Sequence, residues 1–348
     1  MTIATACKIV FRLDATSDIG SGHAMRCIAI AQAISGFGGN SVFAVSCSES
    51  AEFLSSKGYD TVVLGGNSLE LGTADAVTLS KVCADIGAGA LFIDSYGISE
   101  EFFGGLQFLR EKGIRVGYLD DLYTFSTGVQ DFPLKWPVDF VLNYSLYADE
   151  TKYSSAYNET ETKLLLGPGY VPLRHEYWSL TTVTPRKDVC NVLVTSGATN
   201  PKGFLERMSL LACKAFPSAV VHVVVGPKAS FSAPCASLDI IGPQQSLLSL
   251  MKRCDVCITA AGTTLYELSA VGMPTLAVSI VDNQIDNAIA FGCLGLGFGH
   301  AVVDTDEEIL RDMLALNDIN VRQRFAERMQ VTVGGNGAMK IARALLGD

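Results

Sequence analysis

Charged residues are scarce in this sequence. Only 18% of its 348 residues are Asp, Glu, Lys or Arg, whereas globular domains usually contain about 25%. Hydrophobic residues make up 49%, which excludes an intrinsically disordered chain. A chain of this length can bury two sizeable hydrophobic cores, so we expect two domains.

Basic residues are fewer than acidic ones. Lys and Arg total 26 and Asp and Glu total 36, which gives a net charge of −10, and the sequence contains no basic stripe. Nucleic-acid-binding proteins normally carry such a stripe, so we expect no nucleic-acid partner. The acidic balance does not exclude a phosphorylated small molecule, because helix N-termini supply local positive potential.

Long apolar runs are missing as well. No run approaches the roughly 18 residues of a transmembrane helix, and the N-terminus lacks the features of a signal peptide. The 10 cysteines are scattered, mostly within apolar segments, and are predicted to be reduced and buried. We therefore expect a cytoplasmic protein with no membrane partner.

Several familiar catalytic motifs are also missing, among them H-E-x-x-H, the P-loop and G-x-S-x-G. Cys254 and Cys257 have the spacing of a zinc pair, but no second pair accompanies them, and we interpret them as packing residues. Asp120 and Asp121 could bind a metal, but no further ligand has matching spacing, so a turn is predicted. We expect neither a metal nor a cofactor.

What the sequence does contain is a regular alternation of strand-like and helix-like segments. Apolar segments rich in β-formers predict strands at residues 8–13, 41–46, 61–64, 90–94, 115–119, 140–143, 189–195, 219–225, 256–259 and 275–278. Helices are expected directly after residue 23 and at 77–86, 99–112, 202–215, 246–253, 264–271, 282–291 and 337–346.

This alternation predicts an α/β fold of two Rossmann-like, doubly wound domains with an inter-domain cleft, the usual place for a ligand. The weakly periodic stretch 144–187 is interpreted as an inter-domain connection. We place an N-terminal domain at 1–165, a connector at 166–188 and a nucleotide-binding C-terminal domain at 189–348.

The first glycine-containing turn carries a candidate base. Gly20 and Gly22 allow a tight turn after the first strand, and His23 follows where the helix starts. A neutral imidazole there can take a proton near physiological pH. A helix-capping histidine in a phosphate loop is the alternative. Asp94 and Tyr96 follow another buried strand and are expected at the same sheet edge, although this segment also suits a helix N-cap near residue 99.

The second half of the chain carries a candidate nucleotide site. Gly262, Thr263 and Thr264 stand between a strand and a helix, where backbone amides and hydroxyls suit a pyrophosphate. Glu267 lies one turn further and could accept hydrogen bonds from a ribose. The alternative is a capping box made by Thr264 and Glu267.

Four further polar or glycine positions are less specific. Asn283 and Gln284 open a helix after the next strand, at the expected ligand edge. Gly197 could approach a phosphate or simply turn the chain. Arg174 could pair with a phosphate or with Glu176.

In order along the chain, these motifs resemble the UDP-sugar hydrolases of pseudaminic acid biosynthesis, which act on UDP-2,4-diacetamido-2,4,6-trideoxy-β-L-altropyranose. The matching positions cover nearly the whole sequence: Arg12, Asp14, Ile19, Gly20, Gly22, His23, Met25, Arg26, Cys27, Asp94, Tyr96, Gly97, Ile98, Ser99, Asp120, Asp121, Leu122, Asn143, Gly167, Tyr170, Leu173, Arg174, Glu176, Gly262, Thr263, Tyr266, Glu267, Asn283 and Gln284. At 197–200 the family commonly has Gly-Gly-Ser/Thr-Asp, where this sequence has Gly-Ala-Thr-Asn.

The resemblance implies the GT-B fold, as in the glycosyltransferase that adds N-acetylglucosamine to lipid I. It also implies a UDP-sugar substrate, attacked at the anomeric carbon by water without a metal. The implied catalytic residues are His23 as general base, with Tyr96 and Asn283 positioning water and sugar. The implied substrate-binding residues are Arg12, Asp14, Gly20, Gly22, Asp94, Arg174, Gly197, Gly262, Thr263, Thr264, Glu267 and Gln284.

Two other functions share these motifs. In a glycosyltransferase on the same scaffold, His23 would deprotonate an acceptor hydroxyl instead of water. In a nucleotide-sugar-binding protein there would be no turnover, although His23 beside the donor motifs argues against this. Hydrolysis is favoured over transfer because the sequence shows no apolar or basic stretch suited to a membrane-associated acceptor.

Overall fold

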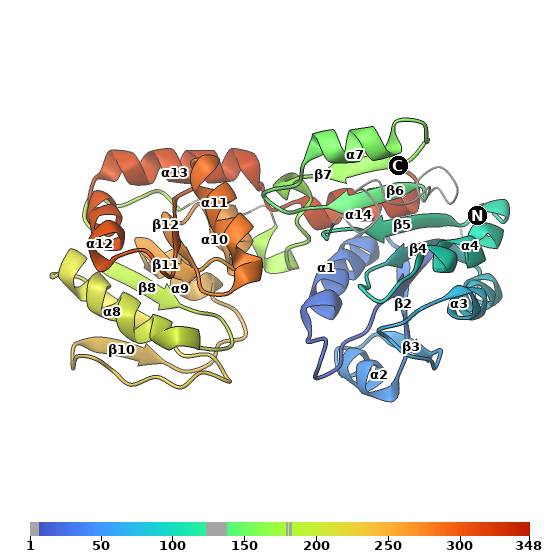
Figure 1. Cartoon of the computed structure of the whole chain (residues 1–348), viewed down its shortest axis with the longest axis horizontal. Coiled ribbons are helices and arrows are strands. Elements are labelled where there is room, and N and C mark those ends of the chain that lie inside the picture. The colour runs from blue at the N-terminus through green and yellow to red at the C-terminus, as the bar shows by residue number, and fades with distance from the viewer. Residues whose placement is uncertain (1–6, 123–137, 179, 181–182) are drawn as a thin grey trace. The chain divides into compact units, whose positions relative to one another are not determined.

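The computed structural model describes residues 7–122, 138–178, 180 and 183–348. The chain forms two compact units. Unit 1 runs to His175 and also contains Asn336–Asp348, and unit 2 is Glu176–Gly335. Figure 1 shows each sheet flanked by its own helices.

Unit 1 is built on a parallel sheet with strand order β3-β2-β1-β4-β5-β6-β7. Its strands are β1 (Lys8–Arg12), β2 (Asn40–Val45), β3 (Asp60–Val63), β4 (Ala88–Ile93), β5 (Arg115–Leu119), β6 (Phe140–Asn143) and β7 (Lys163–Leu166). Its helices are α1 (Gly22–Gly36), α2 (Ser48–Ser55), α3 (Thr73–Asp85), α4 (Glu100–Gly105), α5 (Gln107–Glu111), α7 (Glu150–Tyr157) and α14 (Gly337–Leu346).

Unit 2 has a second parallel sheet with strand order β10-β9-β8-β11-β12-β13. Its strands are β8 (Asn191–Thr195), β9 (Val220–Val224), β10 (Leu238–Ile241), β11 (Val256–Ala260), β12 (Thr275–Ser279) and β13 (Phe298–Ala301). Its helices are α8 (Phe204–Ala215), α9 (Leu248–Arg253), α10 (Thr264–Val271), α11 (Ile285–Cys293), α12 (Asp306–Ala315) and α13 (Ile319–Thr332).

The strand orders locate the ligand edge of each unit. Central strands such as β11 are buried along their whole length, as expected when helices cover both faces of a parallel sheet. In unit 1 the chain order reverses between β1 and β4, and in unit 2 between β8 and β11. In doubly wound sheets, ligands bind beyond the carboxyl ends of the strands at such reversals. The loops after these four strands are therefore the places to look for a site.

The observed units differ from the expected domains at the C-terminal end. Helix α14 belongs to unit 1, whereas the sequence analysis placed it in the second domain. It buries Ala338, Ile341, Ala342 and Leu345, and it packs against α1. The backbone carbonyl of Leu345 also accepts hydrogen bonds from the Arg115 guanidinium. The apolar face of α14 thus completes the cover of the first sheet.

The stretch 144–187 is not merely a connection. It contains α7 and also β7, which pairs with β6 at the edge of the first sheet. Tyr153 of α7 is fully buried. Its hydroxyl donates to the backbone carbonyl of Asp120 and accepts from the Asn143 amide. These contacts fix α7 and β7 to unit 1.

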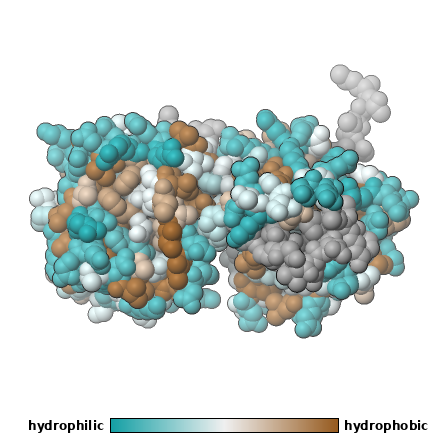
Figure 2. Space-filling model, turned by 45° about the horizontal axis from the view of Figure 1, so that its top comes forward, coloured by the Kyte–Doolittle hydropathy of each residue, from teal (hydrophilic) through white to brown (hydrophobic). Residues whose placement is uncertain are grey.

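The face shown in Figure 2 is mainly hydrophilic, and its hydrophobic residues form small patches. Among the residues that the structure describes, no helix has the length and apolar character required to cross a membrane.

Candidate functional site

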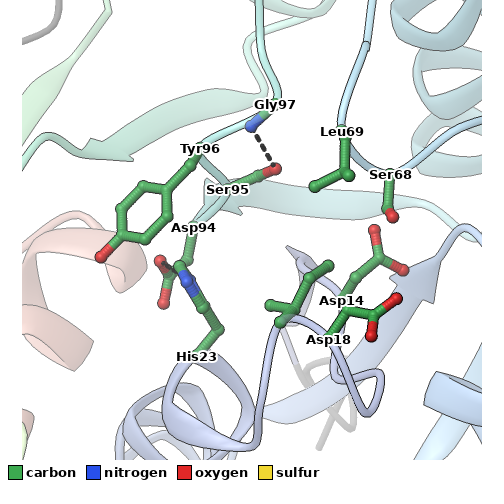
Figure 3. Close-up of a pocket in the computed structure, with 10 residues that line it drawn as sticks. Asp14, Asp18, His23, Ser68, Leu69, Asp94, Ser95, Tyr96 and Gly97 are labelled. Atoms are coloured by element: carbon green, nitrogen blue, oxygen red, sulfur yellow. Dashed lines mark hydrogen bonds and ion pairs between the residues drawn. The ribbon is translucent and has the colours of Figure 1, made fainter.

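The carboxyl ends of β1 and β4 border a cavity of about 260 Å³ in unit 1 (Figure 3). It is lined by Asp14, Asp18, Ile19, His23, Ser68, Leu69, Asp94, Ser95, Tyr96 and Gly97. The cavity therefore lies at the reversal of strand order, where the topology predicts a ligand. It brings together four residues that the sequence analysis selected, namely Asp14, His23, Asp94 and Tyr96.

Two segments far apart in the sequence shape one wall of this cavity. The amide of Leu71 donates to the carbonyl of Gly97 at 2.6 Å, and Ser99 returns a bond to Leu71 at 3.0 Å. A Cβ at position 97 would lie 2.3 Å from the carbonyl oxygen of Ser68. Only glycine therefore permits the approach that places Ser68 and Leu69 beside the cavity.

His23 reaches the cavity from the first turn of α1. Gly20, with φ +82°, makes the turn that precedes the helix, a conformation that glycine adopts without strain. Ser21 is the N-cap residue, so His23 is not the cap. The helix-capping interpretation of His23 is therefore wrong.

Instead, His23 pairs with Asp94, which follows β4. Nδ1 of His23 lies 2.6 Å from Oδ1 of Asp94, and only 7% of the histidine is exposed. We assign the imidazole proton to Nδ1, because a carboxylate accepts it. Nε2 then carries the lone pair and can accept a proton.

Arg26, one helical turn after His23, binds the same carboxylate. Its guanidinium donates from Nε to Oδ2 of Asp94 at 2.6 Å and from Nη2 to Oδ1. Burial alone would raise the pKa of Asp94, but the charge of Arg26, followed by His23 and the hydrogen bonds of both, holds it well below its usual range. Asp94 is therefore a carboxylate at neutral pH.

Arg26 also reaches residues that follow the next two strands. Its Nη1 donates to Oδ2 of Asp121 at 2.9 Å and to the hydroxyl of Tyr144 at 3.0 Å. From the sequence, Arg26 was indicated only by the resemblance, and Asp121 by the resemblance and as part of a predicted turn. No role was predicted for Tyr144. The spacing of His23 and Arg26, which puts both on one face of a helix, was the available signal for Arg26.

Tyr96 lies across the cavity edge from the histidine. The two rings meet edge to face with centroids 4.6 Å apart, and Tyr96 is 54% exposed. Its hydroxyl donates to Oδ2 of Asp121 at 3.2 Å. Burial of part of the phenol, followed by the charge of Asp121, raises the pKa of Tyr96, so it remains a hydrogen-bond donor.

Arg12 has a different place from the one that the resemblance implies. It is 1% exposed, and its guanidinium donates to Asp14 at 2.7 Å and to the Ser46 hydroxyl at 2.6 Å. Asp14 also accepts from the Ser46 amide and hydroxyl. Arg12 thus ties the end of β1 to β2, whereas Asp14 borders the cavity.

In unit 2, the expected nucleotide residues gather at the carboxyl ends of β11 and β12. Helix α10 begins at Thr264, directly after Gly262 and Thr263. A Cβ at Gly262 would lie 3.7 Å from Nε2 of Gln284, so the loop before α10 meets the turn that contains Asn283 and Gln284. The capping-box interpretation is wrong, because Thr263 is the N-cap residue and makes no side-chain capping bond.

The loop after β8 lies at the same edge of the second sheet. Gly197 has φ +84°, and a Cβ at Gly226 would approach its carbonyl oxygen to 2.1 Å. Asn200, where the family pattern has an aspartate, accepts from the Leu205 amide and donates to Glu206. Asn200 therefore anchors the start of α8. Arg174 is partly buried in unit 1 and, in the sequence, stands one residue before the end of this unit's first segment.

In the part of the chain that the structure describes, cysteine and acidic residues form no metal-binding cluster. All ten cysteines are free, and Cys254 and Cys257 are buried, where burial raises the pKa of both thiols. This confirms that they act as packing residues. Within the described ranges, no group of three or more His, Cys, Asp or Glu side chains is placed to hold a metal ion.

Solved structures define the fold class. MurG of Acinetobacter baumannii matches with a TM-score of 0.63 at 14% identity, over 98% of this chain and 100% of that chain. The calicheamicin glycosyltransferase CalG4 matches with a TM-score of 0.59 at 17% identity, over 99% of each chain. These similarities confirm the prediction of two Rossmann-like domains of the GT-B type.

The curated relatives match this chain over only part of their own length. The spore coat polysaccharide biosynthesis protein SpsG of Bacillus subtilis is 27% identical over 60% of this chain and 64% of its own. A Helicobacter pylori protein described as pseudaminic acid cytidylyltransferase and UDP-2,4-diacetamido-2,4,6-trideoxy-β-L-altropyranose hydrolase is 26% identical over 59% of this chain and 37% of its own. An uncharacterized Methanocaldococcus jannaschii protein is 23% identical over 78% of this chain and 55% of its own. The chain thus spans less than two thirds of each, and no protein-family model matches it.

Proposed function

We propose that this protein is an enzyme that hydrolyses a UDP-linked sugar. The observation that carries the proposal is the His23–Asp94 pair at the cavity of unit 1, with Nε2 of His23 left to act as a base. The motifs of the sequence and the description of the Helicobacter pylori relative support a UDP-linked diacetamido-trideoxy sugar of pseudaminic acid biosynthesis as the substrate.

In the proposed reaction, water attacks the anomeric carbon of the sugar. The bond from that carbon to the diphosphate oxygen breaks, and UDP leaves with the bonding electrons. The proton lost by the water passes to Nε2 of His23. The Tyr96 hydroxyl, which stays protonated, is available to orient the water or the sugar.

Unit 2 binds the UDP portion in this proposal. The backbone amides at the start of α10, together with the hydroxyls of Thr263 and Thr264, suit the diphosphate. Glu267, in the first turn of α10, suits the ribose hydroxyls. Asn283 and Gln284 add amide donors from the adjacent turn.

The direct test is to incubate the purified protein with UDP-sugars and no acceptor and to measure UDP. A hydrolase releases UDP and free sugar under these conditions. Glycosyl transfer is the second candidate, because the solved structures of similar fold include MurG and a calicheamicin glycosyltransferase. A transferase would release UDP only after an acceptor bearing a hydroxyl is added.

Glu267→Gln is expected to weaken UDP binding by about 10- to 100-fold. The variant loses a charged acceptor of ribose hydrogen bonds, and such bonds contribute about 1.5–3 kcal/mol. Calorimetric titration with UDP measures the change. Glu307→Gln is the matched control, because Glu307 is an exposed first-turn glutamate of α12. Equal UDP affinity in wild type and Glu267→Gln would remove Glu267 from the nucleotide site.

The sugar is expected to be released with inverted configuration at C1. Of the three carboxylates that line the cavity, Asp14 and Asp94 are held by internal hydrogen bonds, and direct attack by the water that His23 activates is a simpler path than a covalent intermediate on the third, Asp18. Direct displacement inverts the anomeric centre. NMR spectra recorded before mutarotation show the configuration, and mass spectrometry in ¹⁸O-labelled water should find the label in the sugar. Label in UDP would mean attack at phosphorus and would contradict the role proposed for His23.

A further inference from the structure

One side chain joins three of the strand-end loops around the cavity. From α1, Arg26 contacts Asp94 after β4, Asp121 after β5 and Tyr144 after β6. Only 13% of its side chain is exposed. Its Nε, Nη1 and Nη2 atoms thus all donate hydrogen bonds, to two carboxylates and a phenol.

Burying a guanidinium is costly unless well-placed acceptors satisfy its N–H groups. Two of these partners hold the residues to which the proposed function gives a role. Asp94 binds Nδ1 of His23, and Asp121 binds the Tyr96 hydroxyl. Arg26 itself does not line the cavity. Its influence on a bound sugar therefore passes through these two carboxylates.

We propose that Arg26 is a positioning residue that keeps the His23 proton on Nδ1, through Asp94, and fixes Tyr96, through Asp121. The proposal rests on the proposed function for its catalytic meaning, but the proton position can be measured without turnover. Arginine suits this task because its planar fork donates to two carboxylates at once, whereas lysine carries a single ammonium.

The groups around Asp94 determine how its pKa changes when the guanidinium of Arg26 is removed. They are Arg26, His23 and Cys27 from α1, with Tyr96, Asp121 and Tyr144 further out. Arg26 supplies the largest lowering of the pKa of Asp94, and burial raises that pKa. Without Arg26, the pKa of Asp94 therefore rises, and the acid form appears at higher pH. A protonated Asp94 donates to Nδ1, so the proton of a neutral His23 moves to Nε2 and the base is lost.

The test compares Arg26→Met and Arg26→Lys with Arg115→Met. Arg115 is a partly buried arginine of unit 1 that bonds the end of α14 and lies outside the cavity. We expect Arg26→Met to lower kcat about 10- to 100-fold, the usual effect of losing a supporting partner. The acid limb of its kcat profile should move to higher pH. The pH profile of kcat in Arg26→Lys should be closer to that of wild type than in Arg26→Met, because the lysine keeps a positive charge beside Asp94. Arg115→Met should retain the wild-type profile.

Histidine ¹⁵N NMR at neutral pH provides the independent readout. The chain has four histidines, and the signal of His23 is the one lost in His23→Asn. We expect Nδ1–H in wild type, Arg26→Lys and Arg115→Met, and in Arg26→Met a larger share of Nε2–H that grows as the pH falls. If Arg26→Met does not fold, Arg26→Lys combined with Asp121→Ala, which keeps Nδ1–H but removes the acceptor of the Tyr96 hydroxyl, should lower kcat without moving the pH limb.

A double variant distinguishes an effect of Arg26 that passes through Asp94 from an effect that is independent of Asp94. Asp94→Asn removes the partner through which Arg26 acts on His23, so adding Arg26→Met to it should reduce kcat by no more than a few-fold further. An unchanged His23 tautomer in Arg26→Met, or fully additive losses in the double variant, would overturn the proposal. If wild type hydrolyses no UDP-sugar, the proposed function fails, and the tautomer measurement alone decides the role of Arg26.

Discussion

His23→Asn is expected to lower kcat by about 10²–10⁴-fold and to leave UDP affinity unchanged. Positioned general-base catalysis contributes about that much to a rate. Asparagine keeps a polar side chain beside Asp94 but offers no basic nitrogen to water. The residues proposed to bind UDP belong to unit 2, whereas His23 belongs to unit 1, so binding of the free nucleotide should not change. Steady-state kinetics and UDP titration measure the two effects.

His222→Asn is a closely matched control for this variant. His222 is also buried, and its Nδ1 also lies 2.6 Å from an aspartate oxygen, that of Asp239. It belongs to β9 of unit 2 and does not line the cavity. We expect kcat of His222→Asn to stay within a few-fold of wild type. The same small effect in His23→Asn would make His23 structural and place the base elsewhere.

Asp94→Asn is expected to reduce kcat by as much as about 10⁴-fold. The side-chain amide that replaces the carboxylate would donate to Nδ1 of His23 and so place the ring proton on Nε2, the nitrogen that should accept the proton of water. The corresponding change in the serine protease triad has an effect of this size through the same wrong tautomer. Single-turnover kinetics, with enzyme mixed in excess over substrate, isolate the chemical step.

Asp239→Asn controls for the loss of an aspartate partner from a buried histidine. It removes the charge beside His222 and should change kcat little. Full activity of Asp94→Asn at neutral pH would show that the orientation of His23 does not depend on this carboxylate, and it would exclude a mechanism in which Asp94 sets the tautomer of the base.

The central strands were predictable because burial leaves a simple pattern. The prediction 115–119 coincides with β5 and 140–143 with β6, since parallel strands covered on both faces are short apolar runs. The edge strand β7 was missed. Only Leu165 of its four residues is buried, and a half-exposed edge leaves little hydrophobic signal. Helix α7 was missed for a related reason, because its buried residues are two tyrosines in an otherwise polar segment.

The part of the site that could be predicted is the part at strand ends. His23, Asp94 and Tyr96 directly follow the first turn or a buried strand, and parallel topology brings such positions together. The contacts of Arg26 with Asp121 and Tyr144 were beyond prediction, because they depend on the order of β4, β5 and β6 in the sheet. The order of strands in a sheet cannot be deduced from their spacing along the sequence.

The placement of α14 has a consequence for how the protein is made. Unit 1 is interrupted in sequence by the whole of unit 2, so the ribosome delivers all of unit 2 before the last helix of unit 1. During synthesis, domains generally fold as units when their residues emerge. Unit 2 can therefore complete its fold first, while α1, which carries His23, still waits for the helix that packs against it. A nascent chain stopped just before Asn336 would leave that packing surface open to chaperones, and the helix that carries His23 would complete its packing only after Asn336–Asp348 have emerged.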